Sequence, residues 1–220
     1  DLQDQIEHEV EENHELCLTT SSWVRKHLPL RPITGHKGTF GKLMVLSGSE
    51  NYLGAPYLCT AAGMRAGAGL VTLAAPQNII NVVATKLTEN TFLVLPEVQD
   101  DAAAKEASSK LREQVTSGKY RVMLFGPGLG HSDGKAALVK DMLDWGNEPG
   151  FEWPRLVVDA DGLNLLAKIP EWWKQVPANN ILTPHPGELG TMRNQTIDQI
   201  EADRVKSAQE SAKLFNQVVI

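Results

Sequence analysis

Cysteine is scarce in this chain of 220 residues, which has only Cys17 and Cys59. Two cysteines so far apart supply neither a disulfide framework nor the closely spaced clusters of a structural zinc site. The scarcity therefore favours a reducing compartment and argues against a domain held together by disulfides or zinc.

Long apolar runs are lacking as well. No stretch of the sequence approaches the roughly 20 consecutive apolar residues that cross a bilayer. The N-terminus, which has no initiator methionine, does not show the basic and then apolar pattern of a signal peptide. We therefore expect a cytoplasmic domain with no membrane partner.

The chain also has no basic cluster. Its net charge is −6, and residues 1–15 alone contribute seven acidic side chains and no Lys or Arg, so that without them the net charge becomes +1. Binding to a phosphate backbone needs clustered Lys and Arg, so we expect no nucleic-acid partner. Leu2, Ile6 and Val10 have the spacing of a short amphipathic helix, but we interpret residues 1–15 as an acidic tail or linker.

An alternation of strand-like and helix-like segments fills the rest of the chain. Short aliphatic runs occur at residues 43–47, 70–75, 91–96, 121–126, 155–160 and 180–184, and segments of helical composition lie between them. Most of the runs are apolar without alternation, which is typical of parallel strands buried on both faces. We expect one α/β domain over residues 16–220, in which helices cover both faces of a mostly parallel central sheet.

Glycine-rich or polar turns follow four of these runs. They are SGSENYLGA (47–55), GPGLG (126–130), DADGLN (159–164) and PHPGE (184–188). Ligands of such folds bind beyond the carboxyl ends of the strands, so we expect these four turns to form one site.

The GPGLG turn allows a ligand to come close to the backbone. Its alternating glycines, among them Gly128 and Gly130, could aim N–H groups at an anion, or could simply make a tight turn between a strand and a helix. It is not the dinucleotide fingerprint, because His131 stands where the third glycine is needed. Ala55 lies near the start of a predicted helix, whose N-terminus favours anionic groups.

A second glycine-rich segment, GHKGTFGKL (35–43), resembles a phosphate-binding P-loop at first sight. Leu43 replaces the hydroxyl residue that would hold magnesium, so the P-loop interpretation is rejected. His36 and Lys37 could still contact a phosphate or a nicotinamide-like ring, and an exposed loop is the alternative.

Two aspartates and a histidine are candidates for metal binding, ligand binding or proton transfer. Asp159 and Asp161 could hold magnesium through water, orient a hydroxyl or cap the next helix, and we expect one cap and one site residue. His185 lies between two prolines that restrict its backbone, which suits ligand binding or proton transfer. Glu188 could pair with His185 or cap the helix that follows.

Taken together, these motifs resemble a known family. HKGTFGKLMVLSGSENYLGA, AGAGLVTLAAP, LPEV (95–98), GPGLG, VVDADGLNLL and LTPHPGELGTM occur in the order typical of the NAD(P)H-hydrate dehydratase family, a carbohydrate-kinase-related domain of the ribokinase-like superfamily. The resemblance implies a ribokinase-like fold and repair of hydrated NADH or NADPH. In that family, ADP or ATP with Mg²⁺ is thought to phosphorylate the added hydroxyl of the nicotinamide ring, and phosphate then leaves.

The resemblance also assigns residues. It implies that Ala55, Gly130 and His185 contact the hydrated cofactor, and the further candidates are Lys37, Glu97, Gly128 and Asn164 for the substrate and Asp159, Asp161 and Glu188 for magnesium. Family members continue past the equivalent of residues 218–220 into a Gly-Thr-Gly-Asp turn that supplies the catalytic base. We therefore expect this chain to be a fragment whose base lies beyond Ile220, so that its own activity is in doubt. The family further implies a homo-oligomer, such as a tetramer, and in many members a preceding epimerase domain.

Two other functions fit the same residues. One is a ribokinase-like small-molecule kinase, which would leave its phosphorylated product intact. The other is a non-catalytic module that binds a nucleotide or cofactor without turnover.

Overall fold

The computed structural model describes residues 17–220, so the predictions for residues 1–15 lie outside the described residues. The described residues fall into two units, residues 17–35 and His36–Ile220, which are described separately. In the first unit, α2 (Ser21–His27) begins where the Thr20 hydroxyl accepts a hydrogen bond from the Trp23 N–H. No helix in residues 17–220 is long and apolar enough to cross a membrane.

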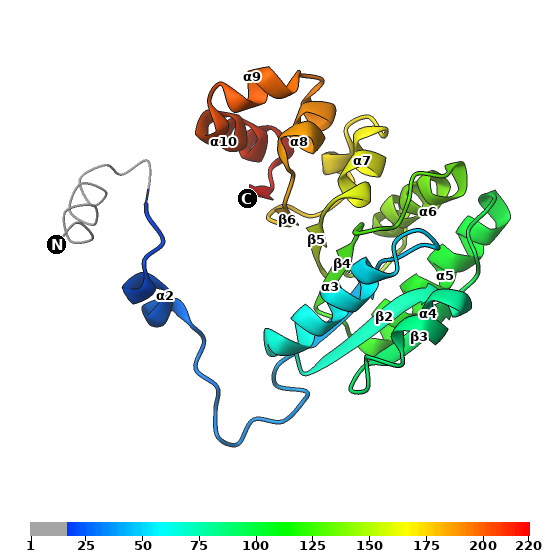
Figure 1. Cartoon of the computed structure of the whole chain (residues 1–220). Helices are drawn as coiled ribbons and strands as arrows, with labels where there is room; N and C mark the ends of the chain where they lie inside the picture. Colours follow the sequence, from blue (N-terminus) through cyan, green and yellow to red (C-terminus); the bar gives the residue numbers. More distant parts are fainter. Residues whose placement is uncertain (1–16) are drawn as a thin grey trace. The chain divides into compact units, whose positions relative to one another are not determined.

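The second unit is built on a parallel sheet (Figure 1). Its strands are β1 (Lys42–Leu46), β2 (Leu70–Pro76), β3 (Thr91–Leu95), β4 (Val122–Phe125), β5 (Arg155–Val158), β6 (Ile181–Leu182) and β7 (Val218–Val219). Every neighbouring pair is parallel, in the order β3-β2-β1-β4-β5-β6-β7. The predicted α/β fold with a parallel sheet is confirmed.

Helices connect these strands. They are α3 (Gly54–Arg65), α4 (Gln77–Val83), α5 (Asp101–Gly118), α6 (Asp133–Leu143), α7 (Asp161–Ala167), α8 (Pro186–Arg193), α9 (Ile197–Glu201) and α10 (Arg204–Phe215), with short 3-10 turns η1 (Asp144–Asn147) and η2 (Trp172–Lys174). Several begin at side-chain caps: Asp100, Ser132 and Asp203 each accept a hydrogen bond from the backbone N–H three residues on. Such caps satisfy amides that have no partner inside the helix, which explains where these helices begin.

The sheet buries apolar side chains on both of its faces. Met44 and Leu46 of β1 belong to a hydrophobic cluster with α5, α6 and α7, whereas Val45 belongs to a separate cluster with α4. Successive side chains of a strand point to opposite faces, so the two clusters lie on opposite sides of the sheet. This explains why the strands appear in the sequence as continuous apolar runs.

An aromatic cluster ties α10 to the rest of the domain. Phe215 is fully buried, and its ring centroid lies 5.5 Å from that of Trp172 and 5.2 Å from that of Trp173, both in η2. The last helix is thereby packed next to β7.

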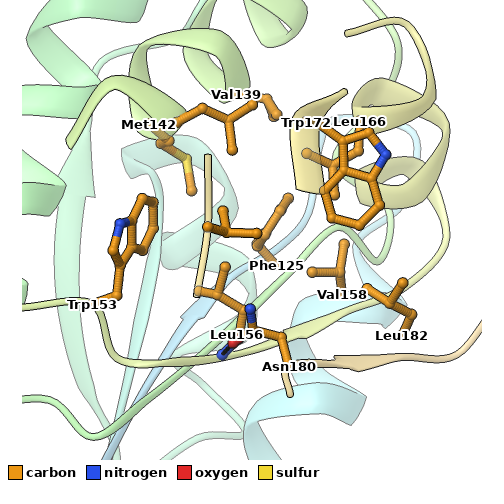
Figure 2. Close-up of a pocket in the computed structure, with 12 residues that line it drawn as sticks. Phe125, Val139, Met142, Trp153, Leu156, Val158, Leu166, Trp172, Asn180 and Leu182 are labelled. Atoms are coloured by element: carbon orange, nitrogen blue, oxygen red, sulfur yellow. Dashed lines mark hydrogen bonds between the residues drawn. The ribbon is translucent and has the colours of Figure 1, made fainter. Parts of the chain in front are cut away.

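A small cavity lies inside this core (Figure 2). Phe125, Trp153 and Trp172 are among its lining residues, and its volume is about 10 Å³. That volume is at the lower limit for a single water molecule. The cavity is therefore a packing defect and is too small for a ligand.

The strand order reverses its direction between β1 and β4. From β1 the chain moves outward through β2 to β3, and from β4 it moves the other way through β5 and β6 to β7. In parallel α/β sheets, the carboxyl ends of the strands at such a reversal form the crevice in which ligands bind. We therefore expect a ligand to bind at the turns after β1 and β4.

We expect Phe215→Ala to lower the free energy of unfolding by about 3–5 kcal/mol, because it leaves a cavity among buried aromatic rings. Leu214→Ala is the matched control, since Leu214 is 51% exposed on the same helix; its effect should stay below about 1 kcal/mol. Urea denaturation of both variants measures the difference. Equal losses would contradict the packing described for α10.

Candidate functional site

Hydrogen bonds join the turn after β1 to the turn after β4. The Ser47 hydroxyl donates to the Pro127 carbonyl at 2.6 Å, and the Gly48 N–H donates to the same oxygen at 3.2 Å. The structure thus brings together two of the four turns at the reversal of the strand order.

Gly128 lies directly against the start of α3. Its φ is +65°, and a Cβ at this position would lie 2.7 Å from Tyr52 Cβ and 2.9 Å from Ala55 Cβ. Both the backbone conformation and the close approach require glycine. Gly128 and Ala55, predicted from separate motifs, are therefore neighbours in the site.

Most N–H groups of the GPGLG turn have partners within the protein. Gly126 N–H donates to the Leu46 carbonyl, Leu129 N–H to the Gly126 carbonyl, and Gly130 N–H to Asp161 Oδ2. Within residues 17–220, the Gly128 N–H is the one amide of this turn left without an acceptor. The neighbouring α3 has no side-chain cap, so its first amides are also open to an anion.

The aspartates after β5 do not cap α7. Asp161 Oδ2 accepts from Gly130 N–H at 2.8 Å, and Asp161 Oδ1 lies 2.7 Å from Nε2 of His131. The N-cap of α7 is Ala160, which makes no side-chain cap. The expectation that one aspartate caps this helix is wrong, because the Asp161 side chain turns toward the GPGLG turn instead.

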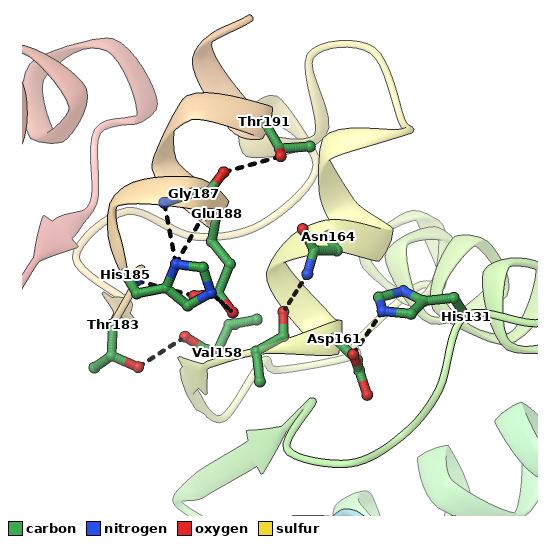
Figure 3. Close-up of polar contacts among 10 residues, drawn as sticks. His131, Val158, Asp161, Asn164, Thr183, His185, Gly187, Glu188 and Thr191 are labelled. Atoms are coloured by element: carbon green, nitrogen blue, oxygen red, sulfur yellow. Dashed lines mark hydrogen bonds and ion pairs between the residues drawn. The ribbon is translucent and has the colours of Figure 1, made fainter. Parts of the chain in front are cut away.

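Asn164 lies one turn further along α7. Its Nδ2 donates to the Ala160 carbonyl at 3.4 Å, which holds the amide next to the start of the helix (Figure 3). This places Asn164 on the same helix as Asp161 at the carboxyl end of β5.

His185 is the N-cap of α8 and forms a capping box with Glu188 (Figure 3). Its Nδ1 accepts from the N–H groups of Gly187 at 3.0 Å and Glu188 at 3.4 Å, and its own N–H donates to Glu188 Oε2 at 2.9 Å. Its Nε2 lies 3.2 Å from Glu188 Oε1. Glu188 therefore both pairs with His185 and completes the cap, so the two alternatives left open by the sequence hold together.

The capping contacts also assign the proton of His185. Because Nδ1 accepts two backbone hydrogen bonds, the neutral ring carries its proton on Nε2. The His185 side chain is 68% exposed, whereas that of Glu188 is 8% exposed. The histidine therefore presents its ring to solvent while a buried carboxylate fixes its orientation.

The three carboxylates predicted for magnesium do not form a metal centre by themselves. Among residues 17–220, no group of three or more His, Cys, Asp or Glu side chains is arranged to hold a metal ion. Asp161 and Glu188 are engaged in the contacts described above. Mg²⁺ is often bound through one or two carboxylates together with phosphates and water, so Asp159 is the remaining candidate.

Asp159 influences a thiol on α3. Burial raises the pKa of Cys59, the negative charge of Asp159 raises it further, and a hydrogen bond with Ser47 opposes the shift. A thiol with a raised pKa stays protonated near neutral pH and is a poor nucleophile. Cys59 is thus a packing residue at the site rather than a reactive group.

Lys37 lies near the amino-terminal end of β2, opposite to the carboxyl ends of the strands. Gly69, which directly precedes β2, is so close to Lys37 that a Cβ there would lie 1.7 Å from the Lys37 carbonyl oxygen. The Gly69 N–H also donates to the Gly41 carbonyl at 3.0 Å. This segment packs where the strands begin, and the contact of Lys37 and His36 with a ligand stays a prediction from the sequence.

Glu97 follows β3 and faces Lys135, a lysine that no motif of the sequence marks. Its Oε1 lies 4.0 Å from Nζ of Lys135, whose side chain is 7% exposed. Burial lowers the pKa of Lys135, and the charge of Glu97 partly opposes that shift. The only sequence signal for Lys135 was its place in the first turn of the helix after GPGLG.

A parallel α/β sheet with glycine turns at its strand reversal is an architecture that is common among domains that bind nucleotides or cofactors. A carbohydrate-kinase family model described as NAD(P)H-hydrate dehydratase matches residues 43–220. The chain belongs to the NAD(P)H-hydrate dehydratase family.

Individual relatives agree with this assignment. The bifunctional NAD(P)H-hydrate repair enzyme Nnr of Moorella thermoacetica is 36% identical over 203 residues, which are 92% of this chain and 37% of that protein. The ADP-dependent (S)-NAD(P)H-hydrate dehydratase of Bacillus subtilis is 30% identical over 201 residues, which are 91% of this chain and 64% of that protein. The chain therefore spans less than two thirds of the length of either relative.

Solved structures agree on the fold. The ADP/ATP-dependent NAD(P)H-hydrate dehydratase from Bacillus subtilis, co-crystallised with ATP and Mg²⁺, matches with a TM-score of 0.72 and 27% identity over 91% of this chain and 64% of that chain. A ribokinase-like superfamily protein from Enterococcus faecalis matches with a TM-score of 0.73 at 19% identity, over 92% of this chain and 64% of that one. The expected ribokinase-like fold is confirmed.

We expect Lys135→Met to raise the free energy of unfolding by about 1 kcal/mol at neutral pH, because it removes a charge from a poorly solvated position. The folded pKa of Lys135 lies below its ordinary value of 10.5, so the unfolded chain binds more protons and the stability of the wild type rises with pH. The difference in free energy of unfolding between Lys135→Met and the wild type should therefore become smaller between pH 7 and about pH 10. Urea denaturation across this range measures it.

Lys140→Met is the control for this prediction, since Lys140 is exposed on the same helix. The difference in free energy of unfolding between Lys140→Met and the wild type should stay constant between pH 7 and about pH 10. A destabilised Lys135→Met variant would show instead that the pair with Glu97 outweighs the cost of burial.

Proposed function

We propose that the protein containing this chain dehydrates (S)-NADH-hydrate or (S)-NADPH-hydrate back to NADH or NADPH, with ADP or ATP as the phosphoryl donor. The observation that carries this proposal is the meeting of glycine turns at the strand reversal, where Gly128 lies against Ala55 and the start of α3 has no side-chain cap. The named activity of the Bacillus subtilis relative supports it. The enzyme would be a carbon–oxygen lyase that repairs a damaged cofactor.

The chemistry suits a site with few reactive side chains. Hydroxide is a poor leaving group, and transfer of a phosphoryl group to the added hydroxyl turns it into phosphate, which leaves readily. Such a transfer depends on positioning and on neutralising charge more than on a nucleophile. Bound with the nucleotide, Mg²⁺ would supply much of that neutralisation, and Asp159 is the carboxylate that could help to hold it.

The protein residues have mainly binding roles in this proposal. Ala55, Gly128 and Gly130 would shape the crevice for the hydrated cofactor, and His185 would present its exposed ring to it. Asn164 and Glu97 are further substrate contacts. The base that removes the proton of the acceptor hydroxyl stays a prediction from the family resemblance.

The cellular setting is also proposed. We infer a cytoplasmic homo-oligomer, such as a tetramer, that binds neither nucleic acid nor membrane. The bifunctional relatives support a link to a second activity on the same substrate, for which an epimerase domain is the candidate.

The direct test incubates the complete protein with hydrated NADH and Mg²⁺, adding ADP in one sample and ATP in another. We expect NADH absorbance to return with one of the two nucleotides, which identifies the donor. A stable phosphorylated product would favour the small-molecule kinase instead. Binding of the hydrate without turnover by the folded complete protein would favour the binding module.

Replacing His185 separates its capping role from its binding role. His185→Ala should lower the free energy of unfolding by about 1 kcal/mol, because the cap of α8 is lost, whereas His185→Asn should restore most of it. Both variants should bind hydrated NADH more weakly than the wild type, since neither has the imidazole. Wild-type affinity in His185→Asn, measured by calorimetry, would show that His185 acts only as a cap.

A further inference from the structure

Asp161 bridges two parts of the neighbouring turn, and Figure 3 shows its contact with His131. One carboxylate oxygen accepts from Gly130 N–H at 2.8 Å, and the other lies 2.7 Å from His131 Nε2. The Asp161 side chain is 15% exposed. A largely buried carboxylate with both oxygens engaged holds its partners strongly, since hydrogen bonds to a charged group are stronger than neutral ones.

The backbone before Asp161 adopts an unfavourable conformation to place it there. Ala160 has φ 51° and ψ −123°, a region that residues with a Cβ rarely occupy. The turn is closed by the Gly162 N–H, which donates to the Asp159 carbonyl at 3.1 Å. Strain of this kind persists where the surroundings impose it, and it is concentrated at functional sites.

The same turn packs backbone against backbone on the GPGLG turn. A Cβ at Gly126 would lie 1.9 Å from the Asp159 carbonyl oxygen, and a Cβ at Gly162 would lie 2.9 Å from the Phe125 carbonyl oxygen. The contacts of Asp161 extend this packing from Gly126 to the other end of the turn, at Gly130 and His131. Gly128, with its open N–H, lies between these two attachments.

We propose that Asp161 is a positioning residue that fixes the GPGLG turn, through Gly130 and His131, in the shape that receives the hydrated cofactor. The inference deepens the proposed function and rests on it for the identity of the ligand. Gly130, at φ +86°, has the conformational freedom of glycine, so an external bond is needed to hold it in one conformation. Asp161 supplies that bond without touching the ligand.

This role differs from the magnesium role expected for the same residue. A metal ligand would direct a carboxylate oxygen at the cation, whereas both oxygens of Asp161 contact the GPGLG turn and His131. A carboxamide can accept from Gly130 N–H and donate to a neutral imidazole, so Asn should replace Asp in positioning. It should not replace Asp as a ligand of a hard cation, which prefers charged oxygen.

The experiment compares Asp161→Ala, Asp161→Asn and the control Asp133→Asn in the complete protein. Asp133 is exposed in the first turn of α6, two residues from His131. In Asp161→Ala we expect the Gly130 amide to exchange with solvent at least about tenfold faster without any ligand, because its acceptor is gone. The KM for hydrated NADH should rise by about tenfold while kcat changes less, as expected when binding geometry is lost.

Asp161→Asn and Asp133→Asn should both stay within about threefold of the wild type in amide exchange and in KM, since each keeps the bond to Gly130. Loss of activity in Asp161→Asn that is recovered by raising the Mg²⁺ concentration would overturn the proposal in favour of a metal ligand. Wild-type KM and wild-type exchange in Asp161→Ala would overturn it as well.

The amide exchange of Gly130 tests the role of Asp161, and the repair of hydrated NADH tests the proposed function, so either can fail without the other. If the wild type repairs no hydrate with either nucleotide, the proposed function fails, yet the Gly130 amide exchange still tests the positioning role. If Asp161→Ala does not fold, the comparison of Asp161→Asn at low and high Mg²⁺ concentration still decides between positioning and metal binding.

Discussion

The close approach of the GPGLG turn to its two neighbours is the constraint on which the site depends. A side chain at Gly126 would collide with the Asp159 carbonyl oxygen, and one at Gly128 would collide with Tyr52 and Ala55. The turns after β1, β4 and β5 are therefore held together by backbone contacts that only glycine permits. The reversal of strand order between β1 and β4 supplies the location, and these glycines supply the shape.

Polar side chains at the carboxyl ends of the strands mainly hold the backbone in place. His185 and Glu188 start α8 through a capping box, and Asp161 holds the far end of the GPGLG turn. Such side chains have little freedom left, which is what a preorganised binding site needs. The difficult chemistry would then come from the bound nucleotide, and the chain would provide position and open amides.

Much of the fold could be predicted from the sequence because the parallel strands are continuous apolar runs. The same local reasoning selected Gly128 and His185, which the structure places in a tight turn and at the N-cap of α8, since a glycine after a strand and a histidine between prolines are local signals. It could not place the segment of Lys37, because only the hydrogen bond from Gly69 to Gly41 shows that this segment packs where the strands begin. It also failed for Lys135, because burial beside Glu97 depends on how α6 packs against the loop after β3.

The sequence by itself determined the class of fold, the family and the glycine-rich turns after the strands, because hydrophobic period and glycine spacing are properties of short segments. Only the tertiary structure decided what each polar group does. Asp161 was equally suited to a cap, a metal ligand or a site residue until the position of Gly130, 31 residues away in the chain, was known. Hydrogen bonds between distant turns depend on strand order and register, and no local pattern encodes the distance between their atoms.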